Sequence, residues 1–290
     1  MTAQVEMKNV TLKFGKFEAL KDVSLTLEAG RIHGLIGRNG AGKTSLLSLL
    51  AAFREPTHGQ IEIDGDPVFE NPEKMQQVGF IYEKNYADEY ETIPALLEFS
   101  ERYRPNYNKE YANRLLKRFK LPLDKPVYKL SKGMQSALNV VIGLASRTSV
   151  TIFDEAYLGM DAPAREIFYQ EILANQAEHP RTFILSTHLV SEMDYLFDNV
   201  IIIDQGRVLL NEEYETLSAQ GASVTGAAEQ VDAFVSGMKI LNEQRLGGTK
   251  SVMVYGMLNE QNQLAAREQG LEVGPISLQD LFIHLTEEAH

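Results

Sequence analysis

The chain has 290 residues, with 28 Lys and Arg against 40 Asp and Glu, which gives a formal net charge of -12 at pH 7. Because an acidic protein repels a phosphate backbone, we expect no nucleic acid among its partners. The absence of cysteine excludes disulfides and thiolate metal sites, and no apolar stretch reaches the ~20 residues that a membrane-spanning helix needs.

Short strand patterns and helical patterns alternate along most of the chain. The period-two pattern predicts strands, and the pattern of three to four residues predicts helices. The predicted strands are 5–14, 23–27, 32–36, 61–63, 78–82, 150–153, 183–186 and 200–203, and the predicted helices are 43–52, 162–177 and 190–197. Strands that alternate with helices indicate a parallel or mixed sheet covered on both faces, and therefore an α/β fold.

The domain organisation follows from two changes of pattern. Residues 92–146 are helical in pattern, which indicates a helical subdomain inserted into an α/β domain over 1–217. After residue 217 the composition shifts to Gly, Ala and Ser. A small C-terminal α+β unit is predicted over 222–290, with elements at 231–243, 251–256 and 278–285, and it could serve as a dimer contact or a regulatory unit.

A glycine-rich loop follows the predicted strand 32–36 and precedes a predicted helix. Its sequence fits the pattern GxxxxGK[ST], in which glycines let backbone N–H groups curl around phosphates at a helix N-terminus. Lys43 would add a point charge for catalysis, and Thr44 a hydroxyl for Mg²⁺. The residues predicted to bind ATP in this segment are Gly37, Arg38, Asn39, Gly40, Ala41, Gly42, Lys43, Thr44 and Ser45.

An acidic pair follows the buried strand predicted at 150–153. Asp154 is expected to anchor Mg²⁺, and Glu155 to polarise a water molecule that attacks the γ-phosphate. A plain helix N-terminus that favours acidic residues is the alternative explanation for the pair alone. Beside a phosphate loop, the pair predicts an ATPase that uses ATP and Mg²⁺.

Between these motifs lies the segment Leu-Ser-Lys-Gly-Met-Gln at 130–135, and here the sequence resembles the ATP-binding subunits of ABC transporters, whose signature reads LSGGQ. The order of phosphate loop, signature, acidic pair and a strand that ends in Ser-Thr-His at 186–188 is that of the family, and covers about residues 3–217. The resemblance implies a P-loop NTPase of ABC type.

The resemblance also assigns roles to single residues. Phe14 matches the aromatic residue that stacks on adenine, His188 the histidine that contacts the γ-phosphate, and Asp161 belongs to the loop that crosses to a partner subunit. Taken alone, Phe14 could be an ordinary strand aromatic and His188 a structural histidine. Glu83 stands where the family usually has a glutamine that ligates Mg²⁺, and a carboxylate there adds negative charge near the phosphates.

The signature itself departs from the family pattern at Lys132 and Met134 but keeps Ser131 and Gly133. The resemblance implies that Ser131 and Gly133 bind the ATP of a second cassette, because a hydroxyl and a helix N-terminal N–H can both hold a phosphate. Ser131 is also expected to cap the helix that follows, since capping and anion binding use the same groups.

The resemblance implies a function that depends on partners. Two cassettes would pack head to tail around ATP, as a homodimer or a heterodimer, and would drive a separate membrane permease from the cytoplasmic face of the membrane. The aromatic stretch with Tyr82, Tyr86, Tyr90 and residues 92–111 is the predicted groove for the permease, although these tyrosines could also simply pack the subdomain.

Several longer phrases resemble a bacterial exporter-type subgroup of ABC ATPases that is associated with cell-envelope stress. They are LSKGMQSALNVVIGLASR, TIFDEAYLGMD, HPRTFILSTHLVSEM and SLQDLFIHLTEE. Two alternatives remain: a soluble ABC-type ATPase that is not coupled to transport, and a cassette that binds ATP without turnover in a heterodimer.

Overall fold

The computed structural model describes residues 2–219, 221–256, 258 and 260–288. Within them the chain forms two compact units. The first unit comprises residues 1–188 together with 203–208, and the second comprises 189–202 together with 209–290. Each unit has buried apolar side chains of its own.

An antiparallel sheet begins the first unit. Its strands are β1 (Val5–Phe14), β2 (Phe17–Leu27), β4 (His58–Ile63) and β5 (Asp66–Pro67), in the order β2-β1-β4-β5. Buried and more exposed positions alternate along the first residues of β1, as the apolar pattern of that segment requires. The sheet therefore buries one face, and the β1–β2 hairpin places Phe14 directly opposite Phe17.

A second sheet holds the buried strands and has the order β10-β9-β3-β8-β7-β6. Neighbours among β3, β8, β7 and β6 run parallel, and every residue of β3, β7 and β8 is buried. The bounds are β3 (Ile32–Ile36), β6 (Val78–Ile81), β7 (Val150–Asp154), β8 (Thr182–Thr187), β9 (Asn199–Asp204) and β10 (Arg207–Glu213). The predicted α/β fold with a mixed and parallel core is confirmed, and the carboxyl ends of β3, β7 and β8 meet at one edge.

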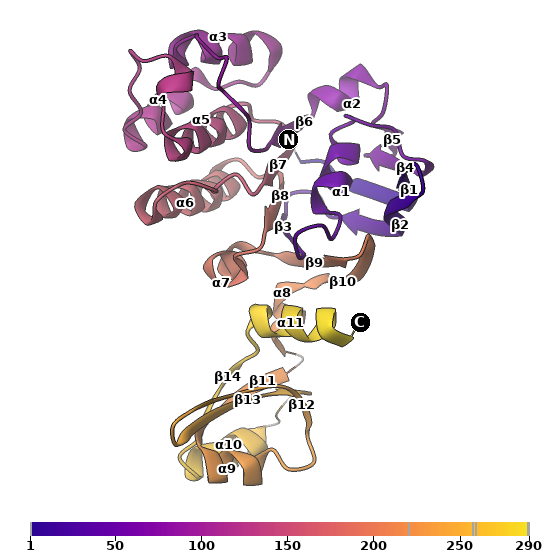
Figure 1. The fold of residues 1–290 in the computed structure, drawn as a ribbon, viewed down its shortest axis with the longest axis vertical. Helices are drawn as coiled ribbons and strands as arrows, with labels where there is room; N and C mark the ends of the chain where they lie inside the picture. Colours follow the sequence, from indigo (N-terminus) through magenta and orange to yellow (C-terminus); the bar gives the residue numbers. More distant parts are fainter. Residues whose placement is uncertain (1, 220, 257, 259, 289–290) are drawn as a thin grey trace. The chain divides into compact units, whose positions relative to one another are not determined.

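Helices surround these strands, and Figure 1 shows α3, α4 and α5 gathered together on one side of the parallel strands. The bounds are α1 (Lys43–Leu50), α2 (Pro72–Gln76), α3 (Ile93–Tyr103), α4 (Lys109–Arg118), η1 (Val127–Lys129), α5 (Lys132–Ala145) and α6 (Ala162–Glu178). Side-chain caps define four of these starts: Asn71 accepts from the Lys74 N–H, Asn108 from the Tyr111 N–H, Ser131 from the Met134 N–H, and Asp161 from the Ala164 N–H. Residues 92–146 are thus helical in structure, as predicted.

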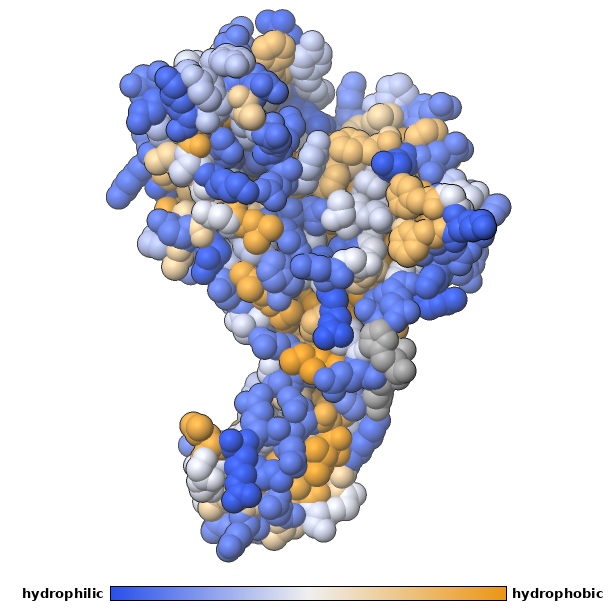
Figure 2. All heavy atoms as spheres, viewed as in Figure 1, coloured by the Kyte–Doolittle hydropathy of each residue, from blue (hydrophilic) through white to orange (hydrophobic). Residues whose placement is uncertain are grey.

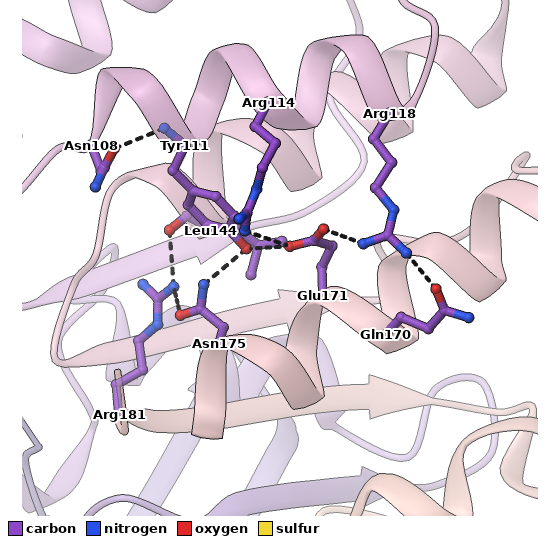
Figure 3. Close-up of polar contacts among 9 residues, drawn as sticks. All are labelled: Asn108, Tyr111, Arg114, Arg118, Leu144, Gln170, Glu171, Asn175 and Arg181. Carbon is purple, nitrogen blue, oxygen red and sulfur yellow. Dashed lines mark hydrogen bonds and ion pairs between the residues drawn. The ribbon is translucent and has the colours of Figure 1, made fainter. Parts of the chain in front are cut away.

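A buried polar network links α4 to α6, as Figure 3 shows. The carboxylate of Glu171 on α6 accepts hydrogen bonds from the Tyr111 hydroxyl at 2.8 Å and from the Arg118 guanidinium. Asn175 donates to the same tyrosine hydroxyl at 2.9 Å and accepts from Arg181, which also donates to a carbonyl of α5. Burial lowers the pKa of Arg181 to about 10, and burial followed by the charge of Glu171 raises the pKa of Tyr111.

The second unit contains a four-stranded antiparallel sheet in the order β12-β13-β11-β14. Its elements are α7 (Val190–Met193), η2 (Asp194–Leu196), α8 (Tyr214–Ala219), β11 (Gly221–Ala227), α9 (Ala228–Phe234), β12 (Lys239–Leu246), β13 (Thr249–Tyr255), α10 (Glu260–Glu268), β14 (Glu272–Pro275) and α11 (Leu278–Glu288). From β11 to β14 the chain runs βαββαβ, the ferredoxin-like arrangement. The predicted element 231–243 is instead the end of α9, a turn and the start of β12.

Candidate functional site

The phosphate loop follows the buried strand β3 and leads directly into α1. Gly40 and Gly42 have φ angles of 83° and 113°, a region that favours glycine. A Cβ on Gly37 would lie 2.6 Å from the carbonyl oxygen of Ile203, so only glycine fits at that close approach. The sequence therefore forms the curled backbone that the motif predicts.

Lys43 is the first residue of α1, and its side chain is only 6% exposed. Its ammonium group donates to the carbonyl of Gly37 at 2.7 Å and lies 3.5 Å from Oε1 of Glu155. A buried ammonium needs anionic or carbonyl partners, and here the loop supplies the carbonyl and Glu155, which follows β7, supplies the carboxylate. The Lys43 ammonium is thus held beside the loop, where it can bind a phosphate.

Thr44 and Asp154 lie in contact, although they are 110 residues apart. The threonine hydroxyl donates to Oδ2 of Asp154 at 2.7 Å. The other carboxylate oxygen, Oδ1, is buried and has no hydrogen-bond partner. A hydroxyl beside a carboxylate with a buried unpaired oxygen is the hard oxygen donor set that Mg²⁺ prefers, so these residues fit that ion.

Glu155 follows β7 with a φ angle of 48°, and its N–H donates to the Ser186 carbonyl at 3.2 Å. This left-handed conformation is costly for a residue other than glycine, and such strain concentrates at functional sites. Nδ1 of His188 lies 3.1 Å from Oε1 of Glu155, the same oxygen that faces Lys43. The predicted catalytic residues Glu155, His188 and Lys43 are therefore brought together.

Tyr157 is a residue of this region that the sequence reasoning missed. Its side chain is 2% exposed, and its hydroxyl forms a hydrogen bond with the hydroxyl of Thr187 at 2.8 Å. The backbone N–H of His188 donates to the same phenol oxygen at 3.4 Å. The position of His188 thus depends on Tyr157, which no spacing in the sequence signals, because the contact spans 31 residues.

A cavity of about 600 Å³ surrounds the phosphate loop. Its walls include the predicted residues Arg38, Asn39, Gly40, Gly42, Lys43, Thr44, Ser45, Glu83, Asp154 and Glu155. Phe17 also lines it and is 65% exposed. Phe14, the predicted adenine residue, is 43% exposed and lies under the Arg54 guanidinium, whose carbon is 5.0 Å from the ring centroid. The cavity wall therefore includes the hairpin neighbour of Phe14, a residue that the sequence reasoning did not single out.

The signature residues form a separate group outside that cavity wall. Ser131 caps α5, and its oxygen accepts from the Met134 N–H at 3.3 Å. A Cβ on Gly133 would lie 2.5 Å from the carbonyl oxygen of Gly159, so α5 rests closely on the loop that leads to Asp161. Ser136 strengthens this contact by donating to the Leu158 carbonyl at 2.6 Å. The start of α5 and the loop that leads to Asp161 therefore pack directly against each other.

Comparison with known proteins gives consistent matches. A family model described as ABC transporter matches residues 20–158. The chain is 29% identical to the ABC transporter ATP-binding protein YtrB of Bacillus subtilis (strain 168) over 218 residues, which are 72% of this chain and 74% of that protein. It is 32% identical to the ABC transporter ATP-binding protein NatA of the same strain over 207 residues, 69% of this chain and 84% of that protein. Other relatives are named for spermidine/putrescine import and for Nod factor export.

A solved structure described as the ATP-binding subunit of an ABC transporter has the same fold. The TM-score is 0.67 at 26% identity, and the match covers 74% of this chain and 92% of that chain. Among the described residues, no helix combines the length and the apolar character needed to cross a membrane.

Proposed function

The chain belongs to the ABC transporter family of ATP-binding proteins, and we propose that it powers export through a separate membrane permease. As a member of this family it binds ATP and is an ATPase, and the ATP-binding subunits of the family pair with one another and act with transmembrane permeases. Our finer proposals concern the roles of single residues, the metal, the partner surfaces and the direction of transport.

The observation that carries the catalytic proposal is the approach of Lys43 and His188 to one oxygen of Glu155 at 3.5 and 3.1 Å. We assign Lys43 to the phosphates of ATP. Glu155 is assigned to a water molecule: the carboxylate accepts a proton from the water as the water oxygen attacks the γ-phosphorus. His188 would orient that carboxylate and reach the γ-phosphate. The Lys43 ammonium and the His188 ring thus both contact Glu155 at the edge of the cavity.

Thr44 and Asp154 are the residues that we assign to Mg²⁺, because the unpaired Oδ1 of Asp154 is buried beside the threonine hydroxyl. The ion, when bound, neutralises charge on the phosphates. Glu83 lines the same cavity and is a further oxygen donor for the metal. For the adenine ring we retain Phe14, with Phe17 as the neighbouring aromatic that lines the cavity.

Ser131, Gly133 and Asp161 are assigned to the second cassette. None of them lines the cavity of its own phosphate loop. A hydroxyl and backbone N–H groups at the start of α5 can hold an anion, so a second copy that faces this surface would offer its ATP to them. The ATP site would then be complete only in a head-to-tail pair, as a homodimer or a heterodimer.

An exposed aromatic groove is the surface that we assign to the permease. The ring centroids of Phe53 and Phe80 are 5.4 Å apart and those of Phe80 and Tyr82 are 5.0 Å apart, while Phe53, Phe99 and Tyr103 are more than half exposed. Most of the face seen in Figure 2 is hydrophilic, but apolar side chains reach the surface between α1 and the helices of residues 92–146. Such aromatic patches mark protein contacts.

The predicted groove is only partly open to a partner. Tyr86 is 5% exposed and Tyr111 is 6% exposed, and both donate hydrogen bonds inside the unit. These two tyrosines therefore pack the subdomain, whereas Tyr82 and Tyr90 remain candidates for the permease contact. Tyr90 is 70% exposed, with its ring centroid 5.2 Å from that of Tyr128.

We propose export, a link to cell-envelope stress and a place at the cytoplasmic face of the membrane on the basis of the four sequence phrases that resemble the exporter-type subgroup. Residues 222–290 are proposed as a domain that adds a dimer contact or regulation. Relatives named for import and for export both exist, so direction needs its own measurement.

The deciding experiment combines hydrolysis with transport. Purified protein should release phosphate only with Mg²⁺ and lose that activity in Glu155→Gln. The protein should co-purify with a membrane subunit from its native host. A reversal of surface charge beside the groove, such as Arg102→Glu, should uncouple transport into inverted vesicles while basal hydrolysis persists. Phosphate release without any associated permease would support an uncoupled ATPase, and ATP binding without release would support a binding-only cassette.

A further inference from the structure

An ion pair joins the loop after β6 to the first residue of α5. Nζ of Lys132 lies 3.2 Å from Oε1 of Glu83, and the two positions are 49 residues apart. Their side chains are 83% and 60% exposed. Lys132 departs from the family's signature, and Glu83 stands where the family usually has a glutamine. The structure places these two residues in contact.

Glu83 forms part of the wall of two cavities. One is the cavity of about 600 Å³ around the phosphate loop. The other, of about 710 Å³, is lined by Lys132, Ser136 and Gly159 as well as Glu83. The ion pair thus connects the edge of the nucleotide cavity with the start of the signature helix.

The charges around the nucleotide cavity explain why a cation is needed at this edge. Its lining carries two cationic residues, Arg38 and Lys43, and three carboxylates, Glu83, Asp154 and Glu155. The carboxylate of Glu83 repels an anionic nucleotide unless an opposite charge lies close to it. Lys132 supplies that charge, although a cation at the first position of a helix opposes the helix dipole and so gains nothing from α5 itself.

We propose that Lys132 is a positioning residue for Glu83. The pair offsets the charge that Glu83 presents to the nucleotide, and it holds the carboxylate toward the signature side of the cavity. Because exposed ion pairs are weak, the pair can open when metal and nucleotide reach Glu83. This inference rests on the proposed binding of MgATP at the phosphate loop.

A double-mutant cycle tests the pair in the full-length protein. Lys132→Gln leaves Glu83 uncompensated and should raise both the Kd for MgATP and the KM by about threefold, the size expected for an exposed charge pair, with a smaller change in kcat. The double variant Glu83→Gln with Lys132→Gln removes both charges and should bring the Kd back toward the wild-type value. The effect of Lys132→Gln should shrink as salt rises from 0.05 to about 0.5 M, because salt screens exposed charges.

The control variant is Lys129→Gln, which removes a nearby cation whose ammonium lies over the Tyr128 ring rather than on Glu83. It should leave the Kd unchanged. A defect in Lys132→Gln that persists in the double variant would overturn the proposal, because Lys132 would then act without Glu83. Equal Kd values in all four proteins of the cycle would overturn it as well. Failure of the proposed function looks different: the wild-type protein would then bind no MgATP, and Lys43→Ala would change nothing.

Discussion

Two carboxylates of the first unit lie beside basic side chains but are bound in different ways. The side chain of Glu171 is 3% exposed, and its two oxygens are shared among Tyr111, Arg118 and, at 3.7 Å, Arg114. The side chain of Glu155 is 19% exposed and borders a cavity, and its two partners, the Lys43 ammonium and the His188 ring, both approach the single oxygen Oε1.

This difference in burial and hydrogen bonding distinguishes a carboxylate that stabilises the fold from one that can take part in a reaction. A carboxylate that is buried and hydrogen-bonded at both oxygens holds helices together and is shielded from water and substrate. A partly exposed carboxylate with partners on one side keeps capacity for a reaction, and the left-handed backbone of Glu155 adds local strain that the fold maintains. Removing Glu155 should therefore affect the rate, and removing Glu171 should affect the stability.

The largest expected effect is on the rate in Glu155→Gln. This change keeps the shape but removes the base, so kcat should fall by a factor on the order of 100 or more, while the melting temperature stays close to that of the wild type. Phosphate release and thermal unfolding measure the two effects. Glu98→Gln is the control, because the Glu98 side chain is 70% exposed and forms a surface ion pair with Arg102 at 3.7 Å, away from the cavity. A parallel loss of stability in Glu155→Gln would remove the distinction between the two acids.

The next largest effect is expected for Glu171→Leu. The change removes the acceptor that the Tyr111 hydroxyl and the Arg118 guanidinium share, while Arg118 keeps its hydrogen bond to Gln170. Breaking a buried ion pair in this way lowers the free energy of unfolding by about 3 to 5 kcal/mol. We use the low end of that range because Arg118 is 36% exposed and can turn to water. Urea unfolding measures the loss, and kcat of the folded protein should change less than about twofold. A rate defect as large as that of Glu155→Gln would show that this network also serves catalysis.

The parts of the molecule differ in how far the sequence predicts them. The strands at 32–36 and 150–153 are apolar runs that the parallel core buries completely, and β3 has the predicted bounds. The phosphate loop was predictable because its backbone depends on glycine at fixed spacing. Glu171 and Tyr157 were not, because their partners lie 53 to 60 and 30 to 31 residues away, and no local pattern encodes such contacts.

The second unit shows how small residues hide a strand. The segment 221–227 is rich in Gly, Ala and Ser, which is typical of a loop, yet it forms β11 at the centre of the sheet. Its small residues follow from close packing: a Cβ on Gly221 would lie 1.9 Å from the Ile276 side chain, and one on Gly226 would lie 2.5 Å from Leu271. Strand propensity is overridden here by the space available, which only the folded structure reveals.

A smaller effect is expected for Tyr157→Phe. Loss of the hydroxyl removes the hydrogen bond to Thr187 and the acceptor for the His188 N–H, so the free energy of unfolding should fall by about 1 kcal/mol. Because His188 lies against Glu155, kcat should also fall by a few-fold. Tyr157 would then support the reaction, as Glu155 does, and not only the stability of the fold. Urea unfolding and phosphate release measure both effects, and Tyr128→Phe, on a ring 36% exposed, is the control. A loss of stability with unchanged kcat would show that Tyr157 has a structural role only, like Glu171.

The smallest effect concerns pH and the Glu171 network. Burial, and then the charge of Glu171, raise the pKa of Tyr111 above its ordinary value of 10.0. Above pH 10 the unfolded chain therefore loses this proton first, so the native state binds more protons and its stability falls as pH rises. Arg181 acts in the opposite sense: its native pKa is about 10 against 12.5 ordinarily, so between these values the unfolded chain binds more protons and stability rises.

Tyr111→Phe removes the first of these two contributions and also takes away a charge that raises the pKa of Arg181, so the opposing contribution of Arg181 stays in place and is not weakened. The variant should be slightly less stable than the wild type at pH 8, where it lacks the hydrogen bond to Glu171, but it should lose less stability between pH 10 and about 11.5. Urea unfolding at several pH values measures both slopes, with Tyr103→Phe as the control, since that ring is 66% exposed. If the two slopes were equal, the phenol of Tyr111 would titrate alike in the native and unfolded states. Glu171 would then not be bound tightly to Tyr111, and the contrast with Glu155 would fail.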